Sequence, residues 1–372
     1  MVSAVPPVAR PERSAWIVLI GVWLAATVAA IWLAGAAAER DARAELARQA
    51  KAAADLHAAV LRSELEKHRS LPVALAGDPD IARLLAGGGT VEAEAINAKL
   101  ETLANQTRAA VIYVIGADGV TRAASNWRLP TSFVGADYGF RPYFLNGMAQ
   151  GQAEFFALGT VSGRPGLYLS RRVEGPGGRA LGVVVVKVEF DALESEWRAS
   201  GEPAYVVDPG GVVLITSEPH WRFRTLEPLD ERRRRLTLTD QTLAPEDLRP
   251  LPFETPDAAP ALIEVAVGGE PQRWMYARTG TATPGWTLHL LAPTRGAIQG
   301  AVVSARAVAA LAVALLAVGA ALLLRRRQRQ AVRARDEQRR REELERRIDE
   351  RTRELRQANQ ALNVEMEDRR GP

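Results

Sequence analysis

A lysine interrupts a run of apolar residues that has the pattern of a buried strand. Lys187 shares one face of this strand with Val183 and Val185, because side chains alternate along a strand. Burying a lysine without a partner is costly, so its ammonium group must either reach water or meet an anion. If Lys187 lies at the end of the strand, its head group can extend into solvent. The other reading predicts an anion-binding site.

One arginine lies within a cluster of aromatic residues, in what we expect to be a loop beside the sheet. Arg141 has Tyr138, Phe140 and Tyr143 as close neighbours in the sequence. The planar guanidinium group can bind both oxygens of a carboxylate. The bland alternatives are that the aromatic residues belong to the core and that Arg141 forms a structural ion pair with Asp137.

Small hydroxyl side chains accompany the two cations. Gly159, Thr160 and Ser162 form a turn with free backbone donors, although these hydroxyls can equally serve to shape the turn. Tyr168 and Ser170 share a face of the strand that follows. Two cations, hydroxyls and aromatic groups in one region predict a pocket for a small anion.

The composition and motifs exclude several other functions. There is no cysteine, which excludes thiol catalysis, disulfides and thiolate metal sites. Metal-ligand spacing, a glycine-rich phosphate loop and a nucleophile elbow are all absent, and none of the four histidines has the acidic neighbour and following proline of a phosphoacceptor box. The net charge of +4 is small, so we expect no nucleic-acid partner. The sequence therefore predicts no catalytic residue, metal or cofactor within this chain.

Two apolar stretches bracket the region that carries these residues. Residues 15–38 and 300–324 are each long enough to cross a hydrocarbon core of roughly 30 Å, which needs ~20 helical residues. Arginines before the first stretch and after the second predict that residues 1–14 and 325–370 are cytoplasmic. Residues 39–306 then lie outside, in a protein that crosses the membrane twice. The alternative for the first stretch is a cleaved signal peptide.

The outer region has an α+β pattern. Residues 39–76 predict one long helix, which Pro72 is expected to end or kink. We expect a membrane-distal ligand-binding module at residues 77–200 and a membrane-proximal module at 201–295. A second helix is expected at residues 81–105, broken near the glycines at 87–89.

The two modules share a pattern that indicates a repeat. Each pairs strands across a glycine turn, and the matched positions have identical spacing in both copies. By aligning residues 182–188 with 285–291, we place Leu290 of the second copy where Lys187 stands in the first. The second module is therefore expected to bind no anion of this kind. The matched positions are Tyr113, Val120 and Ser125 in the first copy and Tyr205, Val212 and Ser217 in the second.

The cytoplasmic segment, residues 325–370, is highly charged and has a helical pattern. Its apolar residues fall near a heptad seam, which favours a parallel dimeric coiled coil. A single solvated helix is the alternative. The seam positions are Leu344, Ile348, Leu355, Ala358 and Leu362.

These segments resemble the sensor region of DctB-type C4-dicarboxylate sensor histidine kinases. The most specific run lies between Phe140 and Lys187, and the resemblance extends over nearly the whole chain. It is carried by residues 71–75, 78–79, 126–127, 132–135, 140–144 (FRPYF), 155–160 (FFALGT), 165–170 (PGLYLS), 183–188 (VVVVKV) and 194–197.

The resemblance implies a double Cache (PAS-like) outer region whose distal module binds the dicarboxylate. It implies ligand contacts by Tyr138, Arg141, Thr160, Ser170 and Lys187. It also implies a homodimer that signals to a cytoplasmic response regulator. Family members continue into a histidine-bearing helix pair and an ATP-binding domain, which are absent here, so ATP and kinase activity are expected only of a longer parent.

The sequence thus predicts a membrane sensor of a two-component system for succinate, malate or fumarate. Two alternatives stay open. One is a sensor of another small anion that feeds a different output domain, such as a chemoreceptor or cyclase. The other is a structural membrane protein whose outer modules bind another protein.

Overall fold

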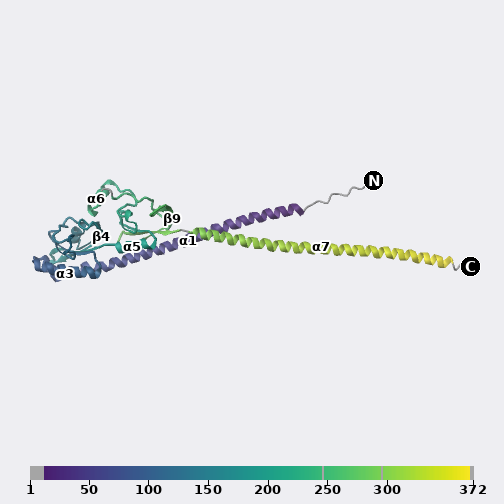
Figure 1. Cartoon of the computed structure of the whole chain (residues 1–372), viewed down its shortest axis with the longest axis horizontal. Coiled ribbons are helices and arrows are strands. Elements are labelled where there is room, and N and C mark those ends of the chain that lie inside the picture. Colours follow the sequence, from purple (N-terminus) through teal and green to yellow (C-terminus); the bar gives the residue numbers. More distant parts are fainter. Residues whose placement is uncertain (1–11, 245–246, 295, 369–372) are drawn as a thin grey trace. The chain divides into compact units, whose positions relative to one another are not determined.

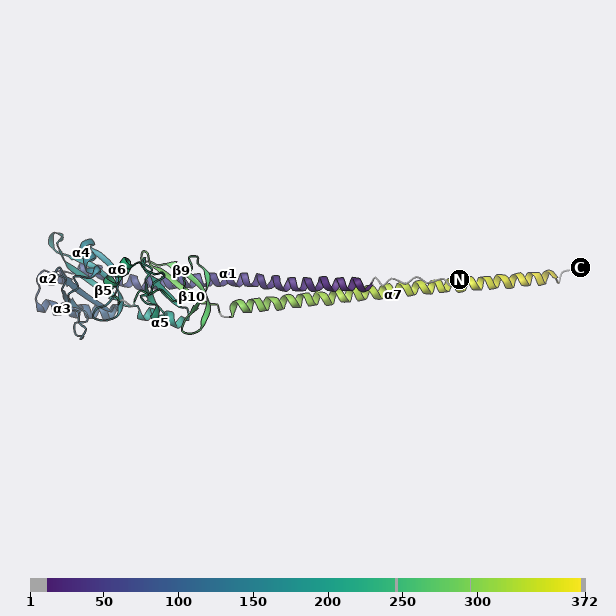
Figure 2. The ribbon, with the colours of Figure 1, turned by 90° about the horizontal axis from the view of Figure 1, so that it is seen from above.

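The computed structural model describes residues 12–244, 247–294 and 296–368 (Figures 1 and 2). It contains two compact parts, one formed by residues 41–298 and the other by residues 1–40 together with 299–372. The predicted cytoplasmic segment 1–14 lies largely outside the described residues, as do the last positions of the predicted coiled coil.

Two long helices account for the apolar stretches. Helix α1 (Glu12–Ala76) and helix α7 (Ala297–Asp368) are both long and apolar enough to cross a membrane. Helix α1 joins the predicted span at residues 15–38 to the predicted long helix. It does not end at Pro72 but continues to Ala76. Pro72 lies in the last turns, where one missing backbone hydrogen bond is a small loss and Leu75 is still buried.

The helices that follow α1 agree with the sequence pattern. Helix α2 (Pro79–Leu85) is capped by the carboxylate of Asp78, which accepts a hydrogen bond from the backbone N–H of Asp80 at 2.9 Å. Helix α3 (Thr90–Thr107) begins after the glycines that were expected to break the segment.

The first sheet has the strand order β2-β1-β5-β4-β3, with every neighbouring pair antiparallel. Two helices that follow strands in sequence, α4 (Pro142–Gln150) and α5 (Asp191–Ser200), complete this region. The strands are β1 (Val111–Gly116), β2 (Thr121–Ala124), β3 (Gln152–Leu158), β4 (Pro165–Glu174) and β5 (Ala180–Val188).

The second sheet has the corresponding order, β7-β6-β10-β9-β8, again antiparallel throughout. Helix α6 (Glu231–Gln241) lies in the long connection before its third strand. The strands are β6 (Ala204–Val207), β7 (Val213–Thr216), β8 (Ala261–Ala266), β9 (Pro271–Gly280) and β10 (Thr287–Pro293).

The two sheets also correspond in detail. In the first, the hydroxyl of Ser125 accepts a hydrogen bond from the backbone N–H of Ile112 at 2.9 Å. In the second, Ser217 accepts the same bond from Ala204 at 3.0 Å. The matched serines of the sequence pattern therefore have the same structural role.

The strand register corrects one expectation from the sequence. Tyr113 pairs with Val185 in the first sheet, and Tyr205 pairs with His289 in the second. Counting two residues onward makes Leu291, not Leu290, the counterpart of Lys187. Register is set by the neighbouring strand, and a shift of one residue exchanges the two faces of a strand.

The two faces of each sheet have different surroundings. One face of both sheets packs with α1 in a single core that includes Leu61, Leu65, Val186 and Leu290. The opposite faces form separate aromatic clusters, which we call the first and second aromatic faces. The first contains Tyr113, Phe133, Tyr138, Tyr143, Phe144 and Tyr168, and the second contains Tyr205, Trp221, Trp274 and Tyr276.

Candidate functional site

The predicted site residues lie together at the first aromatic face. They come from two strands, from the start of a helix and from a loop. Lys187 lies near the end of β5, directly across from Tyr168 of β4. Ser170 lies two residues further along β4. Arg141 is the residue immediately before α4, and Thr160 follows β3.

Lys187 is completely buried, which excludes the reading in which its head group extends into solvent. Its ammonium group donates to the hydroxyl of Ser162 at 2.8 Å, to the backbone C=O of Arg164 at 3.0 Å and to the carboxylate of Glu189 at 2.6 Å. Burial lowers the pKa of Lys187, and the hydrogen bond with Glu189 opposes that shift. The protein therefore already places one carboxylate against this cation.

Two glycines make room for the lysine. A Cβ atom on Gly166 would lie 3.0 Å from Cε of Lys187 and 2.7 Å from the backbone oxygen of Val188. A Cβ atom on Gly159 would lie 3.1 Å from the hydroxyl of Tyr168 and would overlap the hydroxyl of Ser162. The glycines of the 155–160 and 165–170 segments thus allow the backbone to approach the site closely.

A stacked pair of tyrosines connects Lys187 with Arg141, because Lys187 approaches one ring and Arg141 the other. The rings of Tyr143 and Tyr168 have centroids 4.7 Å apart and planes only 7° apart. Nζ of Lys187 lies 5.9 Å from the Tyr168 ring centroid, and Cζ of Arg141 lies 6.0 Å from that of Tyr143. The hydroxyl of Tyr113 donates to the hydroxyl of Tyr143 at 2.8 Å.

These tyrosines remain neutral hydrogen-bonding groups. Burial raises the pKa of Tyr113, Tyr143 and Tyr168 above the usual value for a phenol. Tyr113 and Tyr143 were not among the predicted site residues. Tyr143 lies in the FRPYF segment and could have been included, whereas nothing in the sequence around Tyr113 distinguishes it from an ordinary core residue.

Tyr138 and Thr160 lie together at the rim of the first aromatic face. Tyr138 is buried and Thr160 is exposed. Burial raises the pKa of Tyr138, while Arg141 and a hydrogen bond with Thr160 oppose that shift. The two residues are therefore neighbours.

Ser170 has a mainly structural set of contacts. Its hydroxyl lies 2.8 Å from the backbone oxygen of Tyr143 and 3.3 Å from that of Ala153. These contacts attach α4 to the sheet, and Gly147 of α4 approaches the same hydroxyl closely. Ser170 thus positions the aromatic residues of α4 against the sheet.

Arg141 links β3 of the first sheet to the end of α6. It is only 1% exposed, and it donates to the backbone C=O of Leu158 at 2.8 Å and to the hydroxyl of Thr242, which follows α6. The predicted alternative partner, Asp137, instead accepts a hydrogen bond from the backbone N–H of Gly139 at 2.8 Å. Within the described residues, Nε of Arg141 is buried and has no hydrogen-bond partner.

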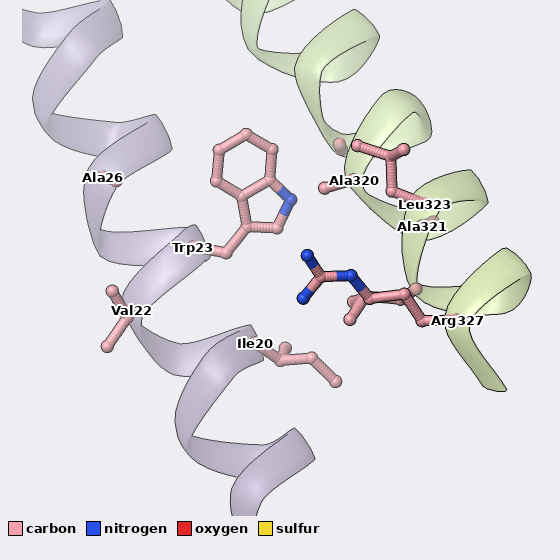
Figure 3. Close-up of a pocket in the computed structure, with 10 residues that line it drawn as sticks. Ile20, Val22, Trp23, Ala26, Ala320, Ala321, Leu323 and Arg327 are labelled. Atoms are coloured by element: carbon pink, nitrogen blue, oxygen red, sulfur yellow. The ribbon is translucent and has the colours of Figure 1, made fainter. Parts of the chain in front are cut away.

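A separate apolar cleft of about 630 Å³ lies between α1 and α7 (Figure 3). Trp23 and Ile20 of α1 face Leu323 and Arg327 of α7 across it. Such a lining is typical of apolar helices that meet lipid or a neighbouring helix. It lacks the convergent polar groups that would recognise a small anion.

Comparison with known proteins confirms the resemblance seen in the sequence. No protein-family model matches the chain. The chain is 43% identical over 362 residues to the C4-dicarboxylate transport sensor protein DctB of Rhizobium meliloti, which covers 96% of this chain and 58% of the relative. It is 33% identical over 333 residues to the DctB protein of Pseudomonas aeruginosa, covering 89% of this chain and 52% of the relative. The chain thus spans somewhat more than half the length of these relatives.

A solved structure supports the fold. The sensor domain of the V. cholerae histidine kinase DctB superposes with a TM-score of 0.60 at 24% identity, covering 67% of this chain and 98% of that domain. This likeness shows that the helices and two antiparallel sheets have the arrangement of that sensor domain.

Proposed function

We propose that this chain, as a relative of the DctB sensor proteins, is the sensing and membrane-spanning part of a two-component histidine kinase that detects a C4-dicarboxylate. The buried Lys187 is the observation that carries the proposal. The ammonium group of this buried lysine is held by Glu189, Ser162 and the backbone oxygen of Arg164, and the proposed ligand carboxylate would take the place of one of these acceptors.

The ligand would use both cations. One carboxylate would meet Lys187, and the other would accept from the unpartnered Nε–H of Arg141. Tyr138 and Thr160 would contribute hydroxyls from the rim, and Ser170 would complete the set or hold α4 in place. The stacked rings of Tyr143 and Tyr168 suit the short carbon chain of the ligand.

Titration of the full chain in detergent micelles tests this proposal. We expect saturable binding of succinate, malate and fumarate, measured by calorimetry. Butyrate, which matches succinate in carbon number but has one carboxylate, is expected to bind at least tenfold more weakly because it leaves one cation without a partner. Equal binding of butyrate and succinate would contradict a site that uses both cations.

The proposal also places the parent protein in a bacterial inner membrane, with the region between α1 and α7 on the periplasmic side. The arginines at 325–327 and the two helices able to cross a membrane support this orientation. Cysteines introduced at the exposed positions Ser200 and Gln330 are expected to differ in labelling by a membrane-impermeant thiol reagent in intact cells, with labelling at position 200 alone. Ser217→Cys, at a buried position of the outer region, is the control that is expected to stay unlabelled. Similar labelling at Ser200 and Gln330 would overturn the orientation.

We further propose that the chain dimerises through α7 and passes the signal to a kinase region that uses ATP and phosphorylates a response regulator. Three seam residues support the dimer, because Leu344, Ile348 and Leu355 are about 60–70% exposed on a helix that buries none of them in one copy. The other seam positions, Ala358 and Leu362, lie outside the described side chains.

A further inference from the structure

The second aromatic face contains a cleft that differs in chemistry from the first. It has a volume of about 730 Å³ and is lined by parts of β9 and β10 and by the loop at residues 250–257. Tyr276, Arg278 and His289 come from the sheet, and Leu226, Leu251 and Phe253 supply apolar walls. By strand register, Tyr276 and Arg278 are the counterparts of Tyr168 and Ser170.

Several buried polar groups at this face have no hydrogen-bond partner among the described residues. They are Nε2 of His289 and the hydroxyl of Tyr205, together with the indole N–H of Trp221 and the hydroxyl of Thr225. The ring of His289 lines the cleft and stacks on Tyr205 with centroids 4.8 Å apart. Nearly all buried polar groups in folded proteins are paired, so such a concentration points to a missing partner.

Tyr276 and His289 form a hydrogen-bonded pair on the sheet side of the cleft. The hydroxyl of Tyr276 and Nδ1 of His289 are 2.9 Å apart, and Arg278 also hydrogen-bonds with Tyr276. Burial and Arg278 lower the pKa of His289 to about 3, so the ring is neutral. The cleft thus offers the exposed guanidinium group of Arg278 beside a neutral polar ring, a combination suited to a carboxylate.

The rim of the cleft has the opposite charge. Glu227, Glu254 and Asp257 lie on the loops that face Arg278, and Asp257 also accepts a hydrogen bond from Arg278 through its backbone oxygen at 2.7 Å. A ligand with a carboxylate at the sheet and an ammonium group at the rim would satisfy both ends. A plain anion would leave the acidic rim opposed to it.

We propose that the second aromatic face binds a small apolar α-amino acid, with its carboxylate at Arg278 and His289, its ammonium group at the acidic rim and its side chain against Leu226 and Phe253. This site is independent of the proposed dicarboxylate site at Lys187.

Calorimetric titration of the full chain with L-leucine tests the proposal. We expect saturable binding of L-leucine, and at least tenfold weaker binding of 4-methylpentanoate and 3-methylbutylamine, which lack its ammonium and carboxylate groups respectively. Arg278→Gln is expected to weaken leucine binding at least tenfold. Arg273→Gln, at another exposed arginine of β9, is the matched control and is expected to change it less than twofold.

Three other results of these titrations would contradict the proposal. Leucine binding that is lost in Lys187→Met but unchanged in Arg278→Gln would place the amino acid at the first aromatic face and overturn the proposal. Equal binding of 4-methylpentanoate and L-leucine would contradict recognition of the ammonium group by the acidic rim. No leucine binding by a chain that still binds succinate would overturn the second site and leave the proposed function intact.

Discussion

Replacing Lys187 with methionine is expected to lower the affinity of the chain for succinate by roughly thirtyfold to several thousandfold. Loss of one charged partner from a desolvated pair typically costs ~2–5 kcal/mol, which corresponds to that range. Methionine retains most of the stem that packs across Gly166, so the variant removes the charge with little change in shape. Calorimetric titration of the full chain in micelles gives the affinity, and circular dichroism checks that the fold is kept.

Replacing Glu189, the carboxylate partner of Lys187, should raise the affinity for succinate. Glu189 already holds the ammonium group at 2.6 Å, so a ligand carboxylate must compete with it. Glu189→Gln removes one negative charge beside the site and is expected to tighten succinate binding severalfold. Asp191→Asn is the matched control, because Asp191 pairs with Arg164 and its charge acts on Lys187 only from a distance. A Lys187→Met variant that binds succinate like the wild type would show that the ligand lies elsewhere.

The parts of this site that could be predicted from the sequence are those with a local signal. Lys187 was identified because a charged residue stands out in an alternating apolar strand, and the pairing of Tyr168 with Lys187 follows from β4 and β5 being neighbours. The sequence also predicted strands paired across a glycine turn, and β1 and β2 form such a pair on either side of Gly119.

The parts that could not be predicted depend on contacts between distant segments. Arg141 and Thr242 are 101 residues apart, and neither has a sequence feature that indicates the other. Helix α6 has four consecutive arginines at 232–235 and no clear apolar face, and β8 is largely half-exposed, so neither gave a usable pattern. Leu291 is the counterpart of Lys187 because of the register between β10 and β6. Aligning residues 182–188 with 285–291 from their first glycine could not reveal that register.

The contact between Arg141 and Thr242 leads to the second prediction, on stability. Arg141→Ala is expected to lower the free energy of unfolding by about 3–6 kcal/mol, because it removes two hydrogen bonds from a charged donor, each typically contributing ~1.5–3 kcal/mol. Thr242→Val removes only the bond to the residue that follows α6, so about 1.5–3 kcal/mol is expected. Denaturant titration of the full chain in micelles, followed by tryptophan fluorescence, measures both.

The Thr242→Val variant distinguishes the contribution of the Arg141–Thr242 hydrogen bond to stability from the contribution of Arg141 to ligand binding. Thr242 has a positive φ of 61°, and because threonine and valine are both β-branched, the backbone strain is the same in each. Thr239→Val is the matched control, since its hydroxyl bonds only within α6, to the backbone oxygen of Arg235 at 3.1 Å. If Arg141 uses its free Nε–H for the ligand, Thr242→Val should keep succinate affinity within about threefold, whereas Arg141→Ala should lose it. Unfolding of Thr242→Val at the wild-type free energy would show that the hydrogen bond between Arg141 and Thr242 does not stabilise the fold.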